Sequence, residues 1–299
     1  MPTKVVVGLL NAEQEFQQLQ ATDARDTAAR LGLEAEVVFA DGHAVVQIQQ
    51  LFKHIHAPEG ERPAAIVVEV ATAEGLERVA RNAVQAGIGW ILVNARVAYV
   101  DGLRAAHPGL PIAMLGTDQK EVGRIQGRQC RRLLPGGGRV LCVQGPADST
   151  VSADRLAGLK EALGKGFEVR GLNGEWTEAS GAKAVASWLR LKTAEAFTPD
   201  IVVSQNDSMA AGARKALRDH RPEWASLPFL GCDGLPNGGQ RMVAQGELAA
   251  TVITPSNTGP AIEIVARWLR TQQTPSHEIL LPPRSHPPED QIRPRGGRG

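Results

Sequence analysis

The sequence has few aromatic residues and few cysteines. Its 299 residues include only five Trp, one Tyr, six Phe and three Cys. An odd number of cysteines in apolar or helical surroundings indicates buried free thiols, and it argues against the disulfide framework of a small secreted scaffold. Because aromatic rings are so scarce, those that stand in loops after predicted strands are candidates for ligand contact.

Neither an excess of one charge nor a long apolar run is present. Lys and Arg number 33 against 32 Asp and Glu, so no strong overall field attracts nucleic acid or an anionic membrane. No apolar run reaches the roughly 18 residues of a membrane-spanning helix, and MPTKVVVGLL lacks the basic region and cleavage site of a signal peptide. We expect no membrane insertion and a small or neutral partner. The location is expected to be cytoplasmic as the sequence stands, and periplasmic if a leader has been removed.

Motifs for cofactors, metals and catalysis are absent from the sequence. No G-x-G-x-x-G follows the first strand, and no G-x-x-x-x-G-K-[ST] occurs anywhere. His54 and His56 stand two residues apart without a cysteine or carboxylate cluster, which favours a solvated helix end over a metal site. Ser149 and Ser152 have no histidine at a suggestive spacing, although a triad forms in space and sequence does not exclude one. We therefore predict no cofactor, no metal and no enzymatic activity.

Short β-branched runs alternate with amphipathic stretches along the chain, which is typical of a parallel sheet with helices on both faces. Single hydrophobic cores stop growing at roughly 250 to 300 residues, so this chain is long enough for two domains and we expect two Rossmann-like lobes. The predicted strands are KVVVGLL, EVVFA, AAIVVEV, WILVN, PIAMLG, RVLCVQG, FEVRGL, DIVVSQ, PFLGC and LAATVIT.

Three crossings between the lobes are predicted. GTDQ at residues 116–119 follows a strand and opens a helix, TVITPSN at 251–257 contains a proline that cannot donate to a central ladder, and LLPPR lies at 280–284. The expected lobes are residues 1–117 with 255–281, and residues 118–254. Beyond them, residues 282–299 are rich in proline, glycine and charge, which favours a disordered tail.

Four segments resemble one family in order and spacing. They are GTDQKEVGRIQG, GPADSTVSADRLAGLKEAL, SQNDSMAAGARKAL and GCDGLPNGGQRMVAQGELAATV. They are similar to segments of the ribose-type periplasmic sugar-binding proteins and of the related effector-binding cores of lac-repressor-like regulators, over about residues 4–282. The resemblance implies two Rossmann-like lobes joined by three hinge crossings, with ligand held between them at the carboxyl ends of the strands. It also implies closure about the hinge on binding.

Candidate ligand contacts in the second lobe follow from the resemblance and from their chemistry. Arg155 offers five donors in a rigid fork, and its place in the first turn after Ser152, a plausible N-cap, is one where the helix dipole disfavours a cation. Asp233 can accept hydroxyl protons and pair with Arg155. Asn206 is implied to hydrogen-bond ligand hydroxyls and can form an Asx turn at the same time, whereas Asp207 is better interpreted as the helix N-cap.

Two aromatic residues complete the expected site. Phe16 and Trp176 fall where the family places rings, so they could sandwich the apolar face of a sugar, although either could instead be core. Glu69, Asn94 and Thr254 stand at further ligand positions of the family, but their residue types depart from the ribose-binding pattern. We therefore expect a neutral monosaccharide or polyol without predicting ribose itself.

The expected function is a monomeric solute-binding protein that captures a small sugar or polyol for an ABC-type sugar transporter. One alternative is a cytosolic ligand-sensing protein related to repressor effector domains, with a membrane sensor as a possible partner. Regulators of that group carry a helix-turn-helix segment before the first strand, and only three residues precede Lys4, so direct DNA binding is not expected. An α/β enzyme is the least favoured alternative.

Overall fold

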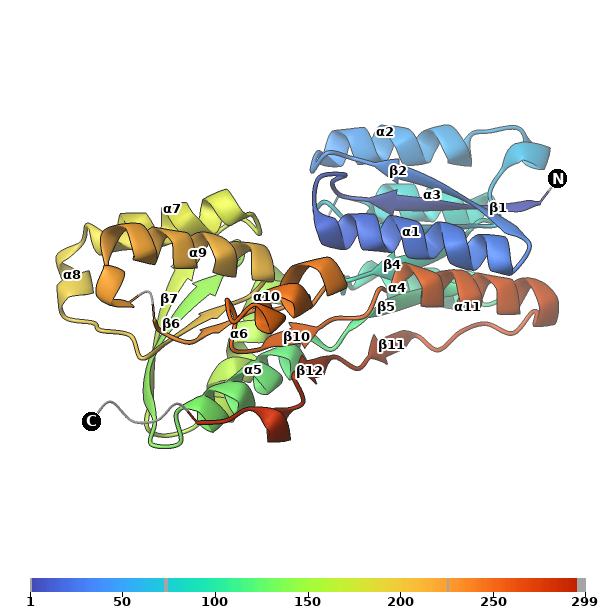
Figure 1. The fold of residues 1–299 in the computed structure, drawn as a ribbon. Coiled ribbons are helices and arrows are strands. Elements are labelled where there is room, and N and C mark those ends of the chain that lie inside the picture. Colours follow the sequence, from blue (N-terminus) through green and yellow to red (C-terminus); the bar gives the residue numbers. More distant parts are fainter. Residues whose placement is uncertain (1, 73–74, 225, 295–299) are drawn as a thin grey trace. The chain divides into compact units, whose positions relative to one another are not determined.

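The computed structural model describes residues 2–72, 75–224 and 226–294. The chain forms two compact units, which Figure 1 shows coloured along the sequence. Unit 1 consists of Met1–Thr117 and Ser256–Leu281, and unit 2 of Asp118–Pro255 and Pro282–Gly299. The chain therefore passes from one unit to the other after Thr117, Pro255 and Leu281.

Unit 1 is built on a six-stranded parallel sheet with the order β11-β5-β4-β3-β1-β2. Its strands are β1 (Thr3–Leu9), β2 (Leu33–Phe39), β3 (Ala65–Glu69), β4 (Gly89–Val93), β5 (Ile112–Thr117) and β11 (Glu278–Leu281). Its helices are α1 (Glu15–Arg30), α2 (Ala44–Ile55), α3 (Glu77–Gln85), α4 (Tyr99–Ala106) and α11 (Thr258–Thr271), with a short 3₁₀ turn at Glu59–Glu61.

Alternation of side chains along the strands gives this sheet two buried faces. Val6 packs into a core with α2, α3 and α4, whereas its neighbours Val5 and Val7 pack on the opposite face with α1 and α11. Helices α1 and α11 lie side by side in Figure 1. Both faces are covered, which explains why the strands read as nearly continuous apolar runs.

Unit 2 repeats this three-layer arrangement on a four-stranded parallel sheet with the order β7-β6-β8-β9. Its strands are β6 (Gly138–Gln144), β7 (Phe167–Asn173), β8 (Ile201–Ser204) and β9 (Phe229–Leu230), and a separate antiparallel pair joins β10 (Thr251–Ile253) to β12 (Arg284–His286). Its helices are α5 (Gln119–Leu133), α6 (Thr150–Leu163), α7 (Glu178–Leu189), α8 (Lys192–Glu195), α9 (Asp207–His220) and α10 (Arg241–Ala244), with shorter turns at Pro222–Trp224, Pro236–Gln240 and Glu289–Gln291.

Paired helices cover the two faces of this second sheet. α5 and α6 pack on one face around Leu159 and Cys142, while α7 and α9 pack on the other around Val185 and Met209. Close helix packing requires glycine at two places in α5 and α6. A Cβ at Gly123 would lie 1.9 Å from a backbone oxygen of α6, and a Cβ at Gly158 would lie 1.9 Å from one of α5.

All ten strands predicted from the sequence are present, but the prediction of a disordered tail from residue 282 is wrong for the described residues up to 294. β12 pairs with β10, and Ile292 is only 5% exposed. Arg128 Nε lies 3.0 and 2.9 Å from the two carboxylate oxygens of Glu289, and Gln129 Nε2 donates to Ser285 Oγ at 2.9 Å. Backbone pairing, one apolar side chain and polar contacts order this segment despite its composition. Residues 295–299 lie outside the described residues.

The interpretation of the two histidines as a solvated helix end holds for His56, which is exposed, and is wrong for His54. His54 is 9% exposed, and its Nε2 lies 3.7 Å from Glu36 Oε1 on β2. Burial lowers the pKa of His54 below its ordinary value, although the nearby Glu36 carboxylate acts in the opposite direction. The ring therefore favours its neutral form in the fold.

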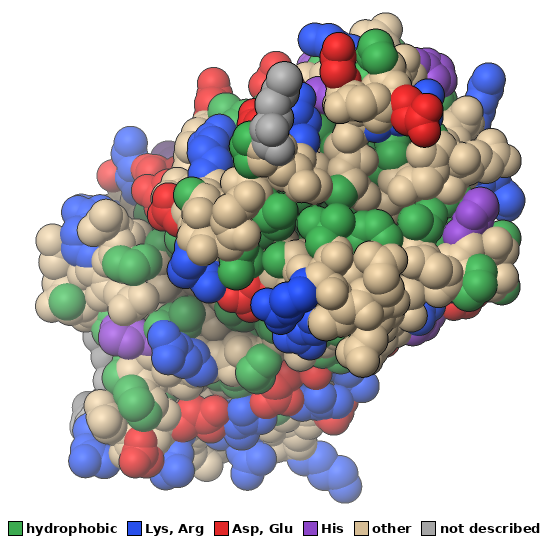
Figure 2. Space-filling view, turned by 90° about the vertical axis from the view of Figure 1, so that its right-hand side faces the viewer, with side chains coloured by type: hydrophobic (Ala, Val, Ile, Leu, Met, Phe, Trp, Pro, Cys, Tyr) green, Lys and Arg blue, Asp and Glu red, His purple; other side chains and the backbone are tan. Residues whose placement is uncertain are grey.

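The surface carries charges of both signs. Figure 2 shows Lys and Arg side chains interspersed with Asp and Glu side chains over the face in view. This mixing agrees with the small net charge of +1. Within the described ranges, none of the helices has both the length and the apolar character that crossing a bilayer requires.

Candidate ligand-binding site

The predicted site residues follow the carboxyl ends of strands in both units. In open parallel sheets, ligands bind at this edge, because the loops that leave the strands gather there. We call the set in unit 1 half-site 1 and the set in unit 2 half-site 2. Half-site 1 contains Phe16, Glu69 and Asn94. Half-site 2 contains Arg155, Trp176, Asn206, Asp233 and Thr254.

Half-site 1 is organised around the Glu69 carboxylate at the end of β3. Gln17 Nε2 and Gln20 Nε2 donate to Glu69 Oε2 at 2.9 and 3.1 Å, and Asn94 Nδ2 lies 3.3 Å from Glu69 Oε1. Phe16 is half-buried in the first turn of α1, directly before Gln17. The structure therefore brings all three predicted residues to one edge of unit 1 and fixes the carboxylate with amide donors.

Sequence reasoning missed the amides that support this half-site. Asn257 Nδ2 donates to Asn94 Oδ1, and Asn257 N donates to Gln20 Oε1 at 2.9 Å. Gln17 Oε1 accepts from Leu10 N at 2.9 Å, which ties the loop after β1 to α1. A signal was available in the sequence, because Gln17 and Gln20 share the buried face of an amphipathic helix where apolar residues are usual.

Three predicted site residues have a left-handed backbone. The φ angles are 56° at Asn94, 63° at Trp176 and 94° at Asp233. Side chains with a Cβ rarely adopt this region, and such residues persist where the surrounding structure holds them, often at functional sites. Of the five non-glycine residues with positive φ in the described ranges, the other two are Asp41 and Gln272, in a turn and at the C-cap of α11.

Arg155 is the cation of half-site 2, and it is only 6% exposed. Its Nε donates to Gln119 Oε1 at 2.8 Å, and its Nη1 donates to Gln205 O. Nη1 also lies 3.8 Å from Asp233 Oδ1, and the guanidinium carbon lies 5.7 Å from the centre of the Trp176 ring. Within the described residues Nη2 donates no hydrogen bond, so part of the fork is available to a ligand.

The helix that carries Arg155 begins earlier than predicted. Ser149, not Ser152, is the N-cap of α6, and its Oγ accepts from Ser152 N at 3.3 Å. Arg155 therefore lies in the second turn of α6, where the unfavourable effect of the helix dipole on a cation is weaker than in the first turn. What holds the cation is its set of acceptors, Gln119, Gln205 and Asp233.

Gln205 is a second residue that sequence reasoning missed. Its Oε1 accepts from Gly145 N at 2.9 Å and from Ser152 Oγ at 2.8 Å, and its Nε2 donates to Ser152 O at 2.9 Å. One fully buried side chain thus joins the loop after β6, the start of α6 and the end of β8. Its backbone oxygen is at the same time an acceptor for Arg155.

Asn206 has a structural role in addition to the predicted ligand contact. It is the N-cap of α9, because its Oδ1 accepts from Met209 N at 2.8 Å. Its Nδ2 donates to Trp176 O at 2.8 Å, which holds the backbone of the Trp176 loop. The prediction that Asp207 caps this helix is wrong, since Asp207 is its first helical residue and its side chain points to other partners. A hydrogen bond from Asn206 to ligand stays a prediction.

Thr254 lies beside the Asp233 turn. It comes directly before Pro255, after which the chain passes to unit 1. Its N donates to Asp233 O at 3.2 Å. Thr254 is 3% exposed, and its buried Oγ1 has no hydrogen-bond partner among the described residues. A buried hydroxyl without a partner is costly, so a ligand hydroxyl or a water would satisfy it.

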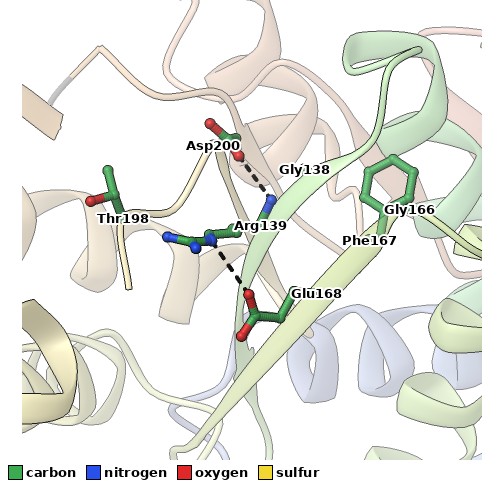
Figure 3. Close-up of a pocket in the computed structure, with 7 residues that line it drawn as sticks. All are labelled: Gly138, Arg139, Gly166, Phe167, Glu168, Thr198 and Asp200. Atoms are coloured by element: carbon green, nitrogen blue, oxygen red, sulfur yellow. Dashed lines mark hydrogen bonds and ion pairs between the residues drawn. The ribbon is translucent and has the colours of Figure 1, made fainter. Parts of the chain in front are cut away.

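A pocket of about 630 Å³ lies on unit 2 at the opposite edge of its sheet (Figure 3). It is lined by Gly138, Arg139, Gly166, Phe167, Glu168, Thr198 and Asp200. Arg139 N donates to Asp200 Oδ2 at 2.8 Å, and Arg139 Nε lies 3.3 Å from Glu168 Oε2. These residues stand at the amino ends of β6, β7 and β8, where parallel sheets do not place their ligand loops. None of the predicted ligand residues is among those that line this pocket.

No grouping of three or more His, Cys, Asp or Glu in the described ranges could hold a metal ion. The three cysteines are buried and free, as the sequence indicated. Burial raises the pKa of Cys142 to about 12 and also raises the pKa of Cys130 and Cys232. Such thiols are structural, because the reactive form of cysteine is the thiolate.

Comparison with known proteins gives a consistent result. Residues 5–259 match the family described as periplasmic binding protein domain. The chain is 26% identical over 193 residues to a putative rhizopine-binding protein of Rhizobium meliloti, covering 63% of this chain and 59% of that protein. It is 32% identical over 165 residues to the D-galactose/methyl-galactoside binding periplasmic protein MglB of Haemophilus influenzae, covering 50% of this chain and 47% of that protein. The chain thus spans about half the length of the curated relatives it matches.

Solved structures share the fold over nearly the whole chain. A Caulobacter myo-inositol binding protein bound to myo-inositol has a TM-score of 0.79 at 21% identity, covering 95% of this chain and 94% of that one. A periplasmic solute binding protein of an ABC transporter from Actinobacillus succinogenes, with bound D-allose, has a TM-score of 0.83 at 18% identity, covering 97% of this chain and 99% of that one. At these identities the likeness concerns the fold.

Proposed function

Because the chain belongs to the periplasmic binding protein domain family, we propose that it captures a small sugar or polyol and delivers it to an ABC-type sugar transporter. Relatives and fold neighbours are named for binding ribose, galactose, D-allose and myo-inositol, which are all polyhydroxylated and uncharged. On this proposal the protein binds its ligand without converting it and works in the periplasm beside its permease.

The observation that carries the proposal is the arrangement of Arg155, Asp233 and Trp176. A sugar presents hydroxyl groups at its edge and C–H groups on its faces, so its site needs fixed donors, fixed acceptors and a flat ring. Arg155 has donors available at Nη2, Asp233 supplies a carboxylate 3.8 Å from Arg155 Nη1, and the guanidinium lies 5.7 Å from the Trp176 ring. All three groups stand at the carboxyl edge of one sheet.

We further propose that one ligand engages both half-sites. Phe16, Glu69 and Asn94 belong to unit 1, whereas Arg155 and Asp233 belong to unit 2, so neither unit alone offers the full set of groups. A ligand that contacts both units binds the closed arrangement more tightly, and only this difference in affinity shifts the population toward it. Hinge closure of this kind is a known behaviour of periplasmic binding proteins.

A thermal-shift panel followed by calorimetry tests the ligand class. We expect D-ribose, D-allose, D-galactose or myo-inositol to raise the melting temperature, while amino acids and nucleotides leave it unchanged. A ligand at about 100 times its Kd stabilises the folded state by about 2.7 kcal/mol, a shift of several degrees. Stabilisation by amino acids or nucleotides alone would contradict the proposal.

The partner protein distinguishes a role in transport from a role in sensing. A cytosolic ligand sensor is the alternative. Genes for a permease and an ATPase beside this one would support transport. A neighbouring regulator or sensor kinase, together with unchanged sugar binding, would support sensing.

A further inference from the structure

Asp207 has a buried carboxylate that contacts the turn formed by the predicted ligand contact Asp233 and Gly234. It is 7% exposed at the start of α9, and its N donates to Cys232 O at 2.7 Å. Its Oδ2 accepts from Gly234 N at 2.8 Å, and its Oδ1 accepts from Thr251 Oγ1 at 2.7 Å. One side chain therefore joins the start of α9, the Asp233–Gly234 turn and strand β10.

Two glycines lie close against this carboxylate. A Cβ at Gly231 would lie 2.0 Å from Asp207 Oδ1, and a Cβ at Gly239 would lie 2.1 Å from Asp207 Oδ2. Two segments that flank the Asp233 turn thus approach the carboxyl group more closely than a side chain allows. Their glycines leave the carboxyl group room to reach Gly234 N and Thr251 Oγ1.

The turn that Asp207 contacts has an unusual backbone. The φ angles are 94° at Asp233 and 59° at Gly234, and a left-handed aspartate persists only where its neighbours hold it. We propose that Asp207 is the positioning residue of the Asp233–Gly234 turn and thereby sets the direction in which Asp233 meets Arg155 and the ligand. The part that concerns the ligand rests on the proposed function above.

The ionisation of Asp207 fits this role. Burial raises its pKa well above the ordinary value, and the Asp233 carboxylate raises it further. The hydrogen bonds from Thr251 and Gly234 act in the opposite direction, as does the Arg155 guanidinium. The titratable groups that face Asp207 are Asp233, Arg155 and the Cys232 thiol, whose own pKa is raised by burial. The raised pKa of Asp207 favours its protonated, neutral form.

Asparagine can reproduce the neutral carboxylic acid. Its amide oxygen can accept from Gly234 N. Its amide nitrogen can donate to Thr251 Oγ1, so that the hydroxyl accepts in the variant where it donates to Asp207 Oδ1 in the wild type. Asp207→Asn should therefore preserve the turn, whereas Asp207→Ala removes both contacts. Thr251→Val, a nearly isosteric change, removes only the contact at Oδ1. Asp200→Ala is a matched control, because Asp200 Oδ2 also accepts one backbone N–H, from Arg139, but at the amino end of β8.

The first arm of the test needs no ligand. Hydrogen exchange by mass spectrometry should show the Gly234 amide exchanging about tenfold faster in Asp207→Ala than in the wild type, because its acceptor is lost. Asp207→Asn and Asp200→Ala should keep wild-type exchange at this amide, and Thr251→Val should accelerate it by a smaller factor. Wild-type exchange in Asp207→Ala overturns the proposal. Should that variant not fold, wild-type exchange in Thr251→Val overturns it instead.

The second arm measures binding of D-ribose, D-allose, D-galactose and myo-inositol by calorimetry. Asp207→Ala should lose about tenfold or more in affinity for any of them that binds the wild type, while Asp207→Asn and Asp200→Ala retain it. Equal losses in Asp207→Asn and Asp207→Ala contradict positioning by hydrogen bonds. If none of the four binds the wild type, the proposed function fails on this class, and the exchange measurement still decides the role of Asp207.

The pH profile of unfolding separates this role from mere packing. A carboxyl group with a raised folded pKa contributes stability that is complete below its unfolded pKa and is lost as pH rises through the folded pKa. The melting temperature of the wild type relative to Asp207→Asn should therefore fall as pH rises from acid toward neutral. A difference that stays constant with pH would show that folding does not shift the pKa of Asp207 and would contradict its protonation in the fold.

Discussion

Replacing Arg155 by alanine is the most direct perturbation of the proposed site. The change removes the donor to Gln119 Oε1 and the donor to Gln205 O, and it removes the cation 3.8 Å from Asp233. It also removes the charge near the Trp176 ring. Because the side chain is 6% exposed, all of these contacts are made away from bulk water.

The expected loss of affinity is large and the expected loss of stability is smaller. Truncating one partner of a buried, hydrogen-bonded charge pair costs about 2 to 5 kcal/mol of binding free energy, much of it from the charge left behind. Here that charge is Asp233, which a bound sugar would cover. A cost of about 2 kcal/mol already corresponds to roughly 30-fold in Kd. In the free protein, removal of a desolvated cation offsets part of the lost hydrogen bonding, so stability should fall by less.

Calorimetry with a sugar found in the panel measures the affinity, and thermal unfolding measures the stability. Arg170→Ala is the matched control, since Arg170 lies 5.6 Å from the centre of the Phe197 ring much as Arg155 lies 5.7 Å from that of Trp176, but on exposed β7. Arg155→Lys keeps the charge without the fork and should be intermediate. An unchanged Kd for Arg155→Ala, or an equal loss in Arg170→Ala, would remove Arg155 from the ligand site.

Three further predictions concern stability and motion. The wild type should lose stability as pH falls from about 7 to about 5. In this range His54 becomes protonated in the unfolded state, whereas its lowered pKa keeps it neutral in the fold. In a series of melting temperatures against pH, His54→Gln should therefore show a smaller decrease over this range. Ile292→Ala should cost about 2 kcal/mol or more in urea unfolding, while exposed Arg293→Ala changes little, and equal effects would contradict a packed C-terminal segment. Small-angle scattering should give a smaller radius of gyration with a tightly bound sugar than without it, and an unchanged radius would contradict closure.

The fold was predictable because its signals are local and repeated. Nine of the ten predicted strands, β1 to β9, lie in doubly covered parallel sheets, as their alternation with helical patterns predicts, whereas the tenth, β10, pairs antiparallel with β12. Residues 282–294 were not predictable in the same way. Composition measures how much a segment can bury, whereas β12 is held by backbone pairing with β10 and by polar contacts such as Arg128 with Glu289. Such partners are distant in the sequence and leave no periodic pattern.

The candidate site was predictable in its positions more than in its contacts. Strand ends place Glu69, Arg155 and Asp233 at the ligand edge of their units, and this follows from strand order alone. The roles of Gln205 and Asn257 were not predictable, since a buried amide is distinguished from an exposed one only by partners from other loops. The incorrect assignment of the α9 N-cap to Asp207 has the same origin. Both residue types cap helices, and only the position of Thr251 and Gly234 shows which one turns inward.

The contacts of the predicted ligand residues lead to the places where the chain changes unit. Arg155 Nε donates to Gln119, which is two residues beyond the crossing after Thr117. Asp233 O accepts from Thr254 N, one residue before the crossing after Pro255. In both cases a residue expected to contact ligand is bonded to a segment that must change its backbone angles if the units move.

The same segments contain buried polar atoms that lack a partner among the described residues. These atoms are Thr117 Oγ1, Thr254 Oγ1 and Asn257 Oδ1, and their side chains are at most 4% exposed. A buried polar group without a hydrogen bond costs about 1 to 3 kcal/mol, so an arrangement that supplies the missing partners gains that much. A ligand hydroxyl, a water or a neighbouring backbone group that reaches these atoms would remove this cost. A ligand that binds Arg155 and Asp233 would then affect the crossings directly, through the hydrogen bonds of these residues to Gln119 and Thr254.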